Sequence, residues 1–390
     1  MQSSVNQNHL QHSEKINLGA FYTPLKYVQI VWNLIEPFLN QNSVIFDSSC
    51  GYGNFFINNT KNYSLKANDI DATASKIAKN NFSHLEIFNK NALYNVSREQ
   101  FNINKNQHLV IIGNPPYNDT TSIIKNHLKQ HNLPIDNVIK TRDYGISFLL
   151  SYAKLNADIV CVLHPLSYLI KKSNFNLLKD FTNNYQLIDG IVIDSSTFKE
   201  TSRSISFPII IGLYLKNKNG MNYDYIKNFT FKTFNNKSFT LQKFDFISNY
   251  ITKYPLKNSS PNKDDILFWT MRDINALKRN KTFVKNFCYN TIIVDKKKLE
   301  YYIYVDVFKQ FSNLIPYYFG NLDVFINHQY FQEYKHFFLT ECLARNNFLQ
   351  NFINTDANIS KLEATKKIQQ YFEQIVKNNY ENSCVMQNIS

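Results

Sequence analysis

A short string of residues suited to holding an amino group follows an apolar run in the first third of the chain. Asn114, Pro115, Pro116 and Tyr117 come directly after residues 109–113, Leu-Val-Ile-Ile-Gly. The Asn114 side-chain oxygen and the Pro115 carbonyl can each accept a hydrogen bond from one amino group. The prolines fix φ and remove competing N–H donors, and Tyr117 offers a flat face for a base. The alternative is a rigid turn in which two prolines only end a strand.

Two acceptors on one amino group have a chemical use, because the lone pair of an amine attached to an aromatic ring is delocalised and weakly nucleophilic. Two acceptors, one for each hydrogen, favour a tetrahedral nitrogen whose lone pair points at a methyl donor. No strong base is needed, because the proton leaves during or after the transfer. The expected catalysis is positional and electrostatic.

Two further polar clusters precede this string. Residues 47–55, Asp-Ser-Ser-Cys-Gly-Tyr-Gly-Asn-Phe, follow an apolar run, and glycines in such a turn let the backbone approach a ligand closely. A carboxylate at Asp47 can meet the amino group of a methionine moiety. Asp69 can accept two ribose hydroxyls, whereas Asp71 is expected to cap the next helix. Read alone, the glycine turn can be only a tight turn, and either Asp only a cap.

The alternation of short apolar runs with helical patterns predicts a doubly wound, mostly parallel α/β sheet. Strands are expected at residues 43–47, 65–69, 84–88, 109–113 and 159–163, with later β-rich runs at 187–193 and 207–215 that form an antiparallel hairpin at the sheet's end. Helices are expected at residues 71–82, 145–155 and 361–377. The polar clusters therefore lie where strands end, which is where α/β folds bind ligands.

The polar stretch 216–222, Lys-Asn-Lys-Asn-Gly-Met-Asn, ends the βα rhythm. We expect a polar N-terminal arm over residues 1–18, a catalytic domain over residues 19–220 and a C-terminal α+β domain over residues 221–390.

The net charge of +13 suits a polyanionic partner. An AT-rich genome that favours Lys, Asn, Ile, Phe and Tyr codons is an alternative explanation. Residues 1–220 carry 21 basic and 15 acidic side chains, and residues 221–390 carry 22 and 15, so the shorter part is the more basic per residue. No apolar run approaches the roughly 20 residues of a membrane span, and the five cysteines lack the spacing of zinc pairs. We expect a cytoplasmic protein with free thiols, no metal and no membrane contact.

With these motifs in this order, the chain resembles the amino-group DNA methyltransferases of bacterial restriction–modification systems, and more narrowly their gamma-type N6-adenine members. Residues 19–24, Gly-Ala-Phe-Tyr-Thr-Pro, match the N-terminal motif of that family. Only about 20 residues separate Asn91 from Asn114, which leaves no room for an inserted recognition domain and selects the gamma order.

The resemblance implies a Rossmann-like fold that transfers a methyl group from S-adenosylmethionine to N6 of an adenine flipped out of duplex DNA. Thr23 would contact the methionine carboxylate of the cofactor. The implied cofactor residues are Tyr22, Thr23, Asp47, Gly51, Asp69, Ile70, Asn91 and Ala92. The implied target-adenine residues are Asn114, Pro115, Pro116 and Tyr117, with Phe207 stacking on the flipped base unless it is a plain core residue.

Two positions depart from the family pattern. The family usually has Asp where Asn91 stands, so a contact to the adenine amino group of the cofactor would rest on an amide oxygen. The methyl-donor turn has Asp-Ser-Ser-Cys where Asp-Pro-Ala/Phe-Cys is commoner. Both departures affect the expected cofactor affinity and not the resemblance to the family. The resemblance covers roughly residues 19–216.

By the same resemblance, residues 221–390 form a target-recognition domain for double-stranded DNA, and a separately encoded cognate restriction endonuclease is a further expected partner. Residues 253–298 interleave Lys and Arg with Phe268, Trp269 and Tyr289, an arrangement that suits phosphate contacts. A solvated basic surface is the alternative.

Three other functions are weaker on the sequence. A methyltransferase of a protein glutamine or an RNA purine can use the same Asn-Pro-Pro-Tyr string, but such relatives generally lack the Phe-Tyr-Thr-Pro element and a basic C-terminal domain. A non-enzymatic nucleic-acid-binding protein would not need residues 114–117 and Asp69 intact. Asp323 with Glu333-Tyr334-Lys335 mimics a nuclease pattern that arises easily by chance.

Overall fold

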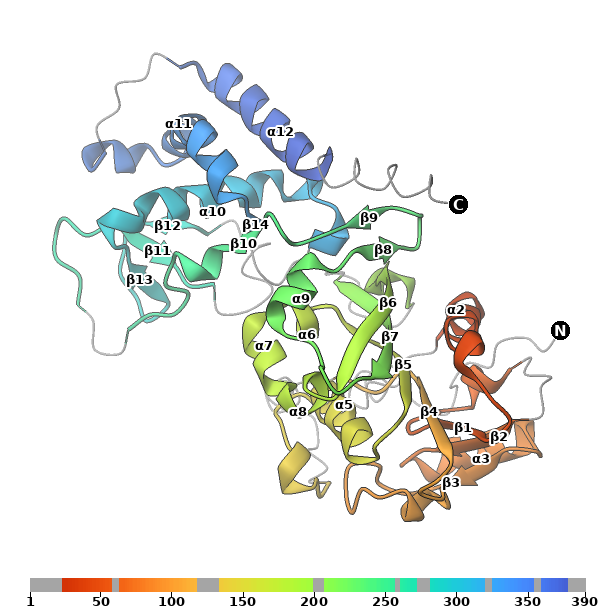
Figure 1. Cartoon of the computed structure of the whole chain (residues 1–390). Helices are drawn as coiled ribbons and strands as arrows, with labels where there is room; N and C mark the ends of the chain where they lie inside the picture. The colour runs from red at the N-terminus through yellow and green to blue at the C-terminus, as the bar shows by residue number, and fades with distance from the viewer. Residues whose placement is uncertain are drawn as a thin grey trace. The chain divides into compact units, whose positions relative to one another are not determined.

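The computed structural model describes residues 23–57, 63–117, 133–198, 207–256, 260–271, 281–319, 325–353 and 359–377 (Figure 1). The chain forms two compact units, residues 1–236 and residues 237–390.

The first unit is built on one sheet with the strand order β3-β2-β1-β4-β5-β7-β6-β8. In chain order these strands are β1 (Ser43–Asp47), β2 (Ser64–Asn68), β3 (Glu86–Phe88), β4 (His108–Gly113), β5 (Ile159–Pro165), β6 (Tyr185–Asp194), β7 (Pro208–Lys216) and β8 (Phe231–Thr233). The first five are mutually parallel where they pair, whereas β7 is antiparallel to both β5 and β6. The predicted doubly wound, mostly parallel sheet with an antiparallel hairpin is confirmed.

The central strands read as unbroken apolar runs because both faces of the sheet are covered. Every residue of β1 and β5 is buried. Ile45 and Val110 belong to a core cluster with Val31 of the first helix, while Phe46 points to the other face and packs on Phe101 at 4.6 Å between ring centroids. The helices of this unit are α2 (Leu25–Ile35), α3 (Ala72–Asn81), α5 (Tyr144–Lys154), α6 (Ser167–Ile170), α7 (Lys172–Leu177), α8 (Lys179–Thr182) and α9 (Tyr223–Asn228).

Helix α3 begins where the sequence predicts. The Asp71 carboxylate accepts hydrogen bonds from the N–H groups of Thr73 and Ala74, at 2.8 and 3.3 Å. This geometry confirms Asp71 as the N-cap and leaves Asp69 available for another role.

The two units divide between Asn236 and Lys237, about 16 residues beyond the boundary expected from composition. The difference arises because α9 and β8 complete the first unit. Ile226 and Phe231 are fully buried, and β8 pairs in parallel with β6 through Ile191 and Val192. The polar break at 216–222 is a turn inside the first unit rather than a linker.

The second unit combines small sheets with three longer helices. Its elements are β9 (Ser238–Phe239), β10 (Asp245–Phe246), β11 (Leu267–Trp269), β12 (Phe283–Val284), β13 (Thr291–Ile293), α10 (Leu299–Phe311), β14 (Phe325–Ile326), α11 (His328–Arg345) and α12 (Lys361–Lys377). Strand β11 pairs antiparallel with both β12 and β13, and β10 pairs antiparallel with β14. This unit has α+β character, as the sequence predicts.

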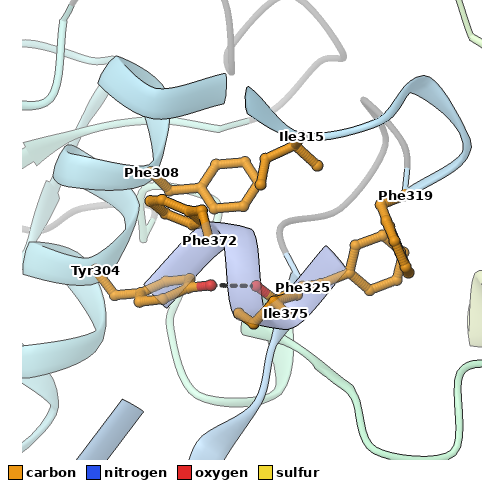
Figure 2. A pocket seen from close by; sticks show the side chains of 7 residues that line it. All are labelled: Tyr304, Phe308, Ile315, Phe319, Phe325, Phe372 and Ile375. Carbon is orange, nitrogen blue, oxygen red and sulfur yellow. Dashed lines mark hydrogen bonds between the residues drawn. The ribbon is translucent and has the colours of Figure 1, made fainter. Parts of the chain in front are cut away.

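Aromatic side chains form the core of the second unit (Figure 2). The Tyr304 hydroxyl donates to the Phe325 carbonyl at 2.6 Å, and Phe308 meets Phe372 at 5.7 Å between ring centroids. The void among these rings measures about 10 Å³ and has an almost wholly apolar lining. Since it is hardly large enough for one water molecule, it belongs to the packing of the core and is not a ligand site.

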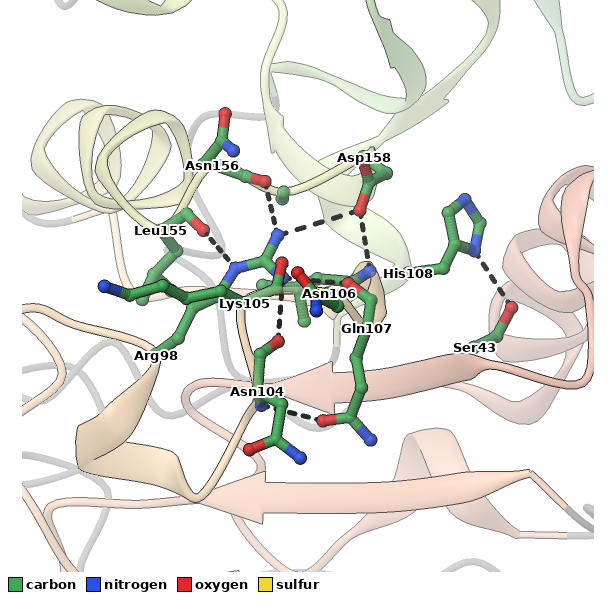
Figure 3. A network of polar contacts seen from close by, with 12 residues as sticks. Ser43, Arg98, Asn104, Lys105, Asn106, Gln107, His108, Leu155, Asn156 and Asp158 are labelled. Carbon is green, nitrogen blue, oxygen red and sulfur yellow. Dashed lines mark hydrogen bonds and ion pairs between the residues drawn. The ribbon is translucent and has the colours of Figure 1, made fainter.

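One buried arginine ties together the amino ends of β4 and β5 (Figure 3). Arg98 is 7% exposed and lies 3.7 Å from Asp158, whose carboxylate accepts from the Leu109 N–H. Its guanidinium also donates to five backbone carbonyls, those of Asn104, Lys105, Gln107, Leu155 and Asn156. A planar group with five donors suits such a cluster of carbonyls.

We expect Arg98→Ala to lower the free energy of unfolding by about 3 kcal/mol, because buried carbonyls lose their donor. Urea denaturation followed by circular dichroism measures the change. Lys105→Ala is the matched control, because the Lys105–Glu99 pair spans 3.8 Å between exposed side chains. That variant should change stability by less than about 0.5 kcal/mol. Equal losses in the two variants would contradict the structural role of Arg98.

Candidate active site

The predicted motifs meet at the carboxyl edge of the parallel strands. Asp47 ends β1, where it lies level with Ala67 of β2 and Ile112 of β4. The chain moves outward from β1 to β3 and then returns to place β4 on the other side of β1. Loops that leave two such neighbouring strands diverge, and the crevice between them is the usual ligand site of open α/β sheets.

The glycine turn after β1 is held by Asp69. Gly51 and Gly53 have φ of +54° and +84°, a backbone region that favours glycine. The Asp69 carboxylate accepts from the Gly51 N–H at 2.7 Å and from the Asp71 N–H at 2.9 Å. Gly51 and Asp69, both expected to bind the cofactor, are thus brought into direct contact.

Asp47 is a buried carboxylate with one satisfied oxygen. It is 1% exposed, and its Oδ1 accepts from the Ser49 N–H at 3.0 Å. Burial raises the pKa of Asp47 to about 8, against the opposing effect of the Ser49 N–H and with a smaller contribution from the negative charge of Asp69. A carboxylate in this setting becomes ionised most readily when a cation binds beside it.

Gly113 allows the Asp47 carboxylate to lie against the end of β4. A Cβ at Gly113 would come 2.7 Å from Asp47 Oδ1, and its φ of +139° is rarely adopted by L side chains. Any side chain here would push Asp47 and the start of the Asn114 motif apart. Because Gly113 has no side chain, the turn that begins at Asp47 can lie close to the residues that follow β4.

The structure brings Asn114 to Thr23 and Tyr117 to Phe207. Asn114 Nδ2 donates to Thr23 Oγ1 at 3.2 Å, while its Oδ1 is buried with no hydrogen-bond partner in the described parts of the chain. Tyr117 and Phe207 pack edge to face with centroids 6.3 Å apart. Pro115 is buried and Pro116 is partly buried, so residues 114–117 are held in place directly after β4.

The aromatic ring of Tyr117 is partly exposed but its hydroxyl is buried. Burial raises the pKa of that hydroxyl well above its usual range, and the Asn114 amide beside it acts in the opposite direction. Behind the ring, Gly145 at the start of α5 leaves room for Tyr117: a Cβ there would come 2.9 Å from the Tyr117 Cβ. The sequence offers no signal for that contact.

Three further residues expected to bind the cofactor lie just beyond the ends of β2 and β3. Ile70 is apolar yet 42% exposed, and Ala92 is buried. The Asn91 side chain is already hydrogen-bonded: Oδ1 accepts from the Leu93 N–H at 3.0 Å, and Nδ2 donates to the Pro134 carbonyl at 2.7 Å. An amide can make that second bond and a carboxylate cannot, which gives a structural reason for Asn at this position.

Asn68 is a residue whose role the sequence did not indicate. It is fully buried, and its amide donates to the carbonyls of Ser48 and Lys90 and accepts from the Lys90 N–H, each at 3.0 Å. These bonds tie together the loops after β1, β2 and β3. The only sequence signal for this role is that Asn68 directly precedes Asp69, a candidate cofactor residue.

Two predicted elements lie partly outside the described residues. Tyr22 and the start of its motif are not described, nor is Asp323 of the nuclease-like pattern. Glu333 and Lys335 lie on α11, where residues two apart do not face each other, and Lys335 pairs with Glu300 at 3.6 Å. This arrangement does not support a nuclease site.

The described residues contain no three His, Cys, Asp or Glu side chains placed to hold a metal ion. In the same part of the chain, no helix has both the length and the apolar character of a membrane span.

Residues 7–180 match the family model described as N-6 DNA methylase. No protein of curated function matches the sequence.

Several solved structures resemble about half of the chain. A protein described as the modification subunit of a type I restriction enzyme, from Vibrio vulnificus, aligns over 53% of this chain and 47% of its own length, with 16% identity and a TM-score of 0.39. A protein described as a class I S-adenosylmethionine-dependent methyltransferase, from Listeria monocytogenes, aligns over 51% and 62%, with 14% identity and a TM-score of 0.37. A dimethyladenosine transferase from Plasmodium falciparum aligns over 52% and 66%, with 13% identity and a TM-score of 0.35.

The site fits S-adenosylmethionine, the cofactor that the family resemblance implies. Three side-chain oxygens in the glycine turn after β1 are buried and accept no hydrogen bond from the described residues. They belong to Asp47, Ser49 and Asn54. Buried acceptors without partners are rare in folded proteins, and a ligand rich in N–H and O–H donors satisfies them. Asp47 and Asp69 suit the cationic amino group and the ribose hydroxyls.

We expect Asp47→Asn to weaken cofactor binding at least about tenfold, because an amide does not attract the ammonium group. At pH 7 the wild-type protein should also release a proton on binding, since a neighbouring cation lowers a pKa that is about 8 in the free protein. Calorimetry in buffers of different ionisation enthalpy measures both effects. Asp224→Asn, on an exposed turn of α9, should change neither.

The same substitution should stabilise the protein. The folded-state pKa of about 8 exceeds the ordinary value of 3.8, so the folded state holds the proton more tightly and Asp47 costs stability that grows as pH rises from about 4 to 8. Asp47→Asn should therefore raise the melting temperature more at pH 8 than at pH 5. A lower melting temperature at pH 8 would contradict the buried, unpaired state of Asp47.

Proposed function

We propose that this protein is a site-specific DNA methyltransferase that modifies N6 of adenine in duplex DNA, because residues 7–180 match the family model described as N-6 DNA methylase. The observation that carries the proposal is the state of Asn114. Its side-chain oxygen is a buried acceptor without a described partner, at the carboxyl end of β4 and beside the donor turn after β1. An exocyclic amino group supplies the donor that this oxygen lacks.

In the proposed reaction, Asn114 Oδ1 and the Pro115 carbonyl each accept one hydrogen of the target amino group. This geometry takes the nitrogen lone pair out of conjugation with the ring and directs it toward the cofactor site. The bound cofactor supplies a methyl group made electrophilic by its sulfonium. The protein contributes fixed hydrogen-bond acceptors and position rather than a strong base.

The target base must leave the duplex stack to reach these acceptors. We assign the flat face of Tyr117 to stacking on the flipped adenine. Phe207, edge to face with Tyr117 at 6.3 Å between centroids, would bound the same pocket from the start of β7. Its ring is partly buried against the core, so it also supports Tyr117 from behind.

The second unit is proposed to bind the DNA duplex. Residues 253–298 hold eleven Lys and Arg against four Asp, a net charge of +7, which equals the whole excess of residues 221–390. Lys281 lies over the Trp269 ring at 4.5 Å, and Tyr289 is 80% exposed. Basic side chains among exposed aromatics suit phosphate contacts and contacts with bases.

In its cellular setting, the proposed role is the modification component of a type II restriction–modification system, with a separately encoded endonuclease that cuts unmodified sites. Sequencing of DNA from cells that express the protein, with detection of methylated adenines, tests this role and reveals the recognised site. Methylated adenines scattered without a common sequence would contradict site-specific modification.

Asn114→Ala should abolish methyl transfer and leave cofactor affinity within about twofold of wild type, because it removes an acceptor used in the transition state. Radiolabelled methyl transfer to duplex DNA, RNA and protein fractions measures the first effect, and calorimetry measures the second. If Asn114→Ala turns over at a rate close to that of the wild type, Asn114 has no role in the reaction. If the wild-type protein labels RNA or a protein glutamine and leaves DNA unlabelled, that molecule is the substrate and DNA is not.

Replacing Lys296, Lys297 and Lys298 together with Ala should weaken DNA binding and reduce the slope of log affinity against log salt by up to about 2.7, roughly 0.9 for each lost phosphate contact. All three side chains are exposed. The matched control replaces Lys361, Lys366 and Lys367, on or at the start of α12, and removes the same charge from the same unit. Equal changes in the two triple variants would mean that net charge alone, and not this segment, binds DNA.

A further inference from the structure

We propose that Thr23 is a positioning residue for methyl transfer, because it holds the Asn114 amide with its oxygen facing the target amino group. This inference rests on the proposed function and deepens it. It assigns Thr23 a task in the transfer step, in addition to the contact with the cofactor carboxylate that the family resemblance implies.

The carrying observation is a contact between two motifs far apart in sequence. Asn114 Nδ2 donates to Thr23 Oγ1 at 3.2 Å across 91 residues. Thr23 is 3% exposed, so its hydroxyl does not exchange freely with solvent. The bond is therefore a feature of the interior at this site rather than a surface contact.

Thr23 is held in place by the helix that follows it. The Pro24 carbonyl accepts from the N–H groups of Tyr27 and Val28, at 2.9 and 3.3 Å, in the first turn of α2. Val28 and Val31 of that helix are buried in the core that contains Ile45 and Val110. Docking of α2 on the sheet thus fixes the position of the Thr23 hydroxyl relative to β4.

The orientation matters because the two ends of a carboxamide are chemically opposite. Oδ1 accepts hydrogen bonds and Nδ2 only donates them. A reversed amide would direct N–H groups at the target amino group, where an acceptor is needed. With Nδ2 engaged by Thr23, Oδ1 is the end left for the substrate. The unpartnered, buried state of Oδ1 agrees with this assignment.

The test compares Thr23→Val, which keeps the shape but removes the hydroxyl, with Thr23→Ser, which keeps the hydroxyl. Thr182→Val is the matched control, because Thr182 is also 3% exposed and donates to a backbone carbonyl in α8. For each variant, single-turnover methyl transfer at saturating cofactor gives the rate, calorimetry gives the cofactor Kd, and circular dichroism gives the melting temperature.

Thr23→Val should lower the single-turnover rate at saturating cofactor at least about tenfold, as expected for the loss of one positioning hydrogen bond. This loss of rate should remain after any rise in the cofactor Kd is overcome by a higher cofactor concentration. Thr23→Ser should recover most of the rate. Thr182→Val should match the wild type in rate. Its change in melting temperature gives the cost of replacing a buried hydroxyl by a methyl group.

Three results would overturn the proposal. The first is a wild-type rate for Thr23→Val. The second is a loss of rate that disappears once a raised cofactor Kd is saturated, which would leave Thr23 as a cofactor contact alone. The third is a loss in Thr23→Ser as large as in Thr23→Val. If the wild-type protein methylates RNA or protein instead of DNA, the proposed function fails, while the ratio of variant to wild-type rates on that substrate still decides the role of Thr23.

Discussion

The pairing of β4 with β1 is the constraint on which the rest of the site depends. It places Asp47 level with Ile112, so that the donor turn and the Asn114 string leave neighbouring strands at the same edge. Gly113 makes the approach close, because a side chain there would occupy the space of the Asp47 carboxylate. The residues proposed to bind the cofactor and the target base, more than 60 residues apart in sequence, become neighbours through this one register.

The site keeps polar atoms buried at a cost to stability. Asp47, Ser49, Asn54 and Asn114 each have a buried oxygen that accepts no hydrogen bond from the described residues. Some other buried polar groups are satisfied, since Arg98 donates to five carbonyls and Asn68 binds the loops on both sides of it. Others are not, because Gln100 Oε1 and Trp269 Nε1 are also buried without a partner among the described residues. The four oxygens differ in that they gather at the ends of the paired strands β1 and β4, as expected of groups that await a ligand.

The proposed catalysis and the proposed DNA binding depend on different features of the two units. In the first unit, single side chains have fixed partners at the edge of a sheet. In the second, the argument is electrostatic, since residues 253–298 account for the whole net charge of residues 221–390. A contact with phosphate needs positive charge near a surface more than an exact side-chain geometry, which is why sequence composition already indicates it.

The sequence by itself determined the main strands of the large sheet, their order along the chain and three of the helices. Apolar runs with β-branched residues placed β1, β4 and β5 to within about two residues, and helical periodicity placed α3 and α12 equally well. The motif residues Asp47, Asp69 and Asn114 were recognisable because each ends a strand or follows one directly. These features are local, and local propensity and periodicity decide them.

The tertiary structure alone decided which side chains meet. Thr23 on Asn114, Gly113 on Asp47 and Gly145 on Tyr117 are contacts between segments brought together by strand order and helix docking. The unit boundary moved beyond α9 and β8 for the same reason, since β8 is too short to be recognised until it pairs with β6. Sequence patterns report the burial of a residue but not the identity of its partner, because burial depends on periodicity along one element whereas contact depends on the packing of several.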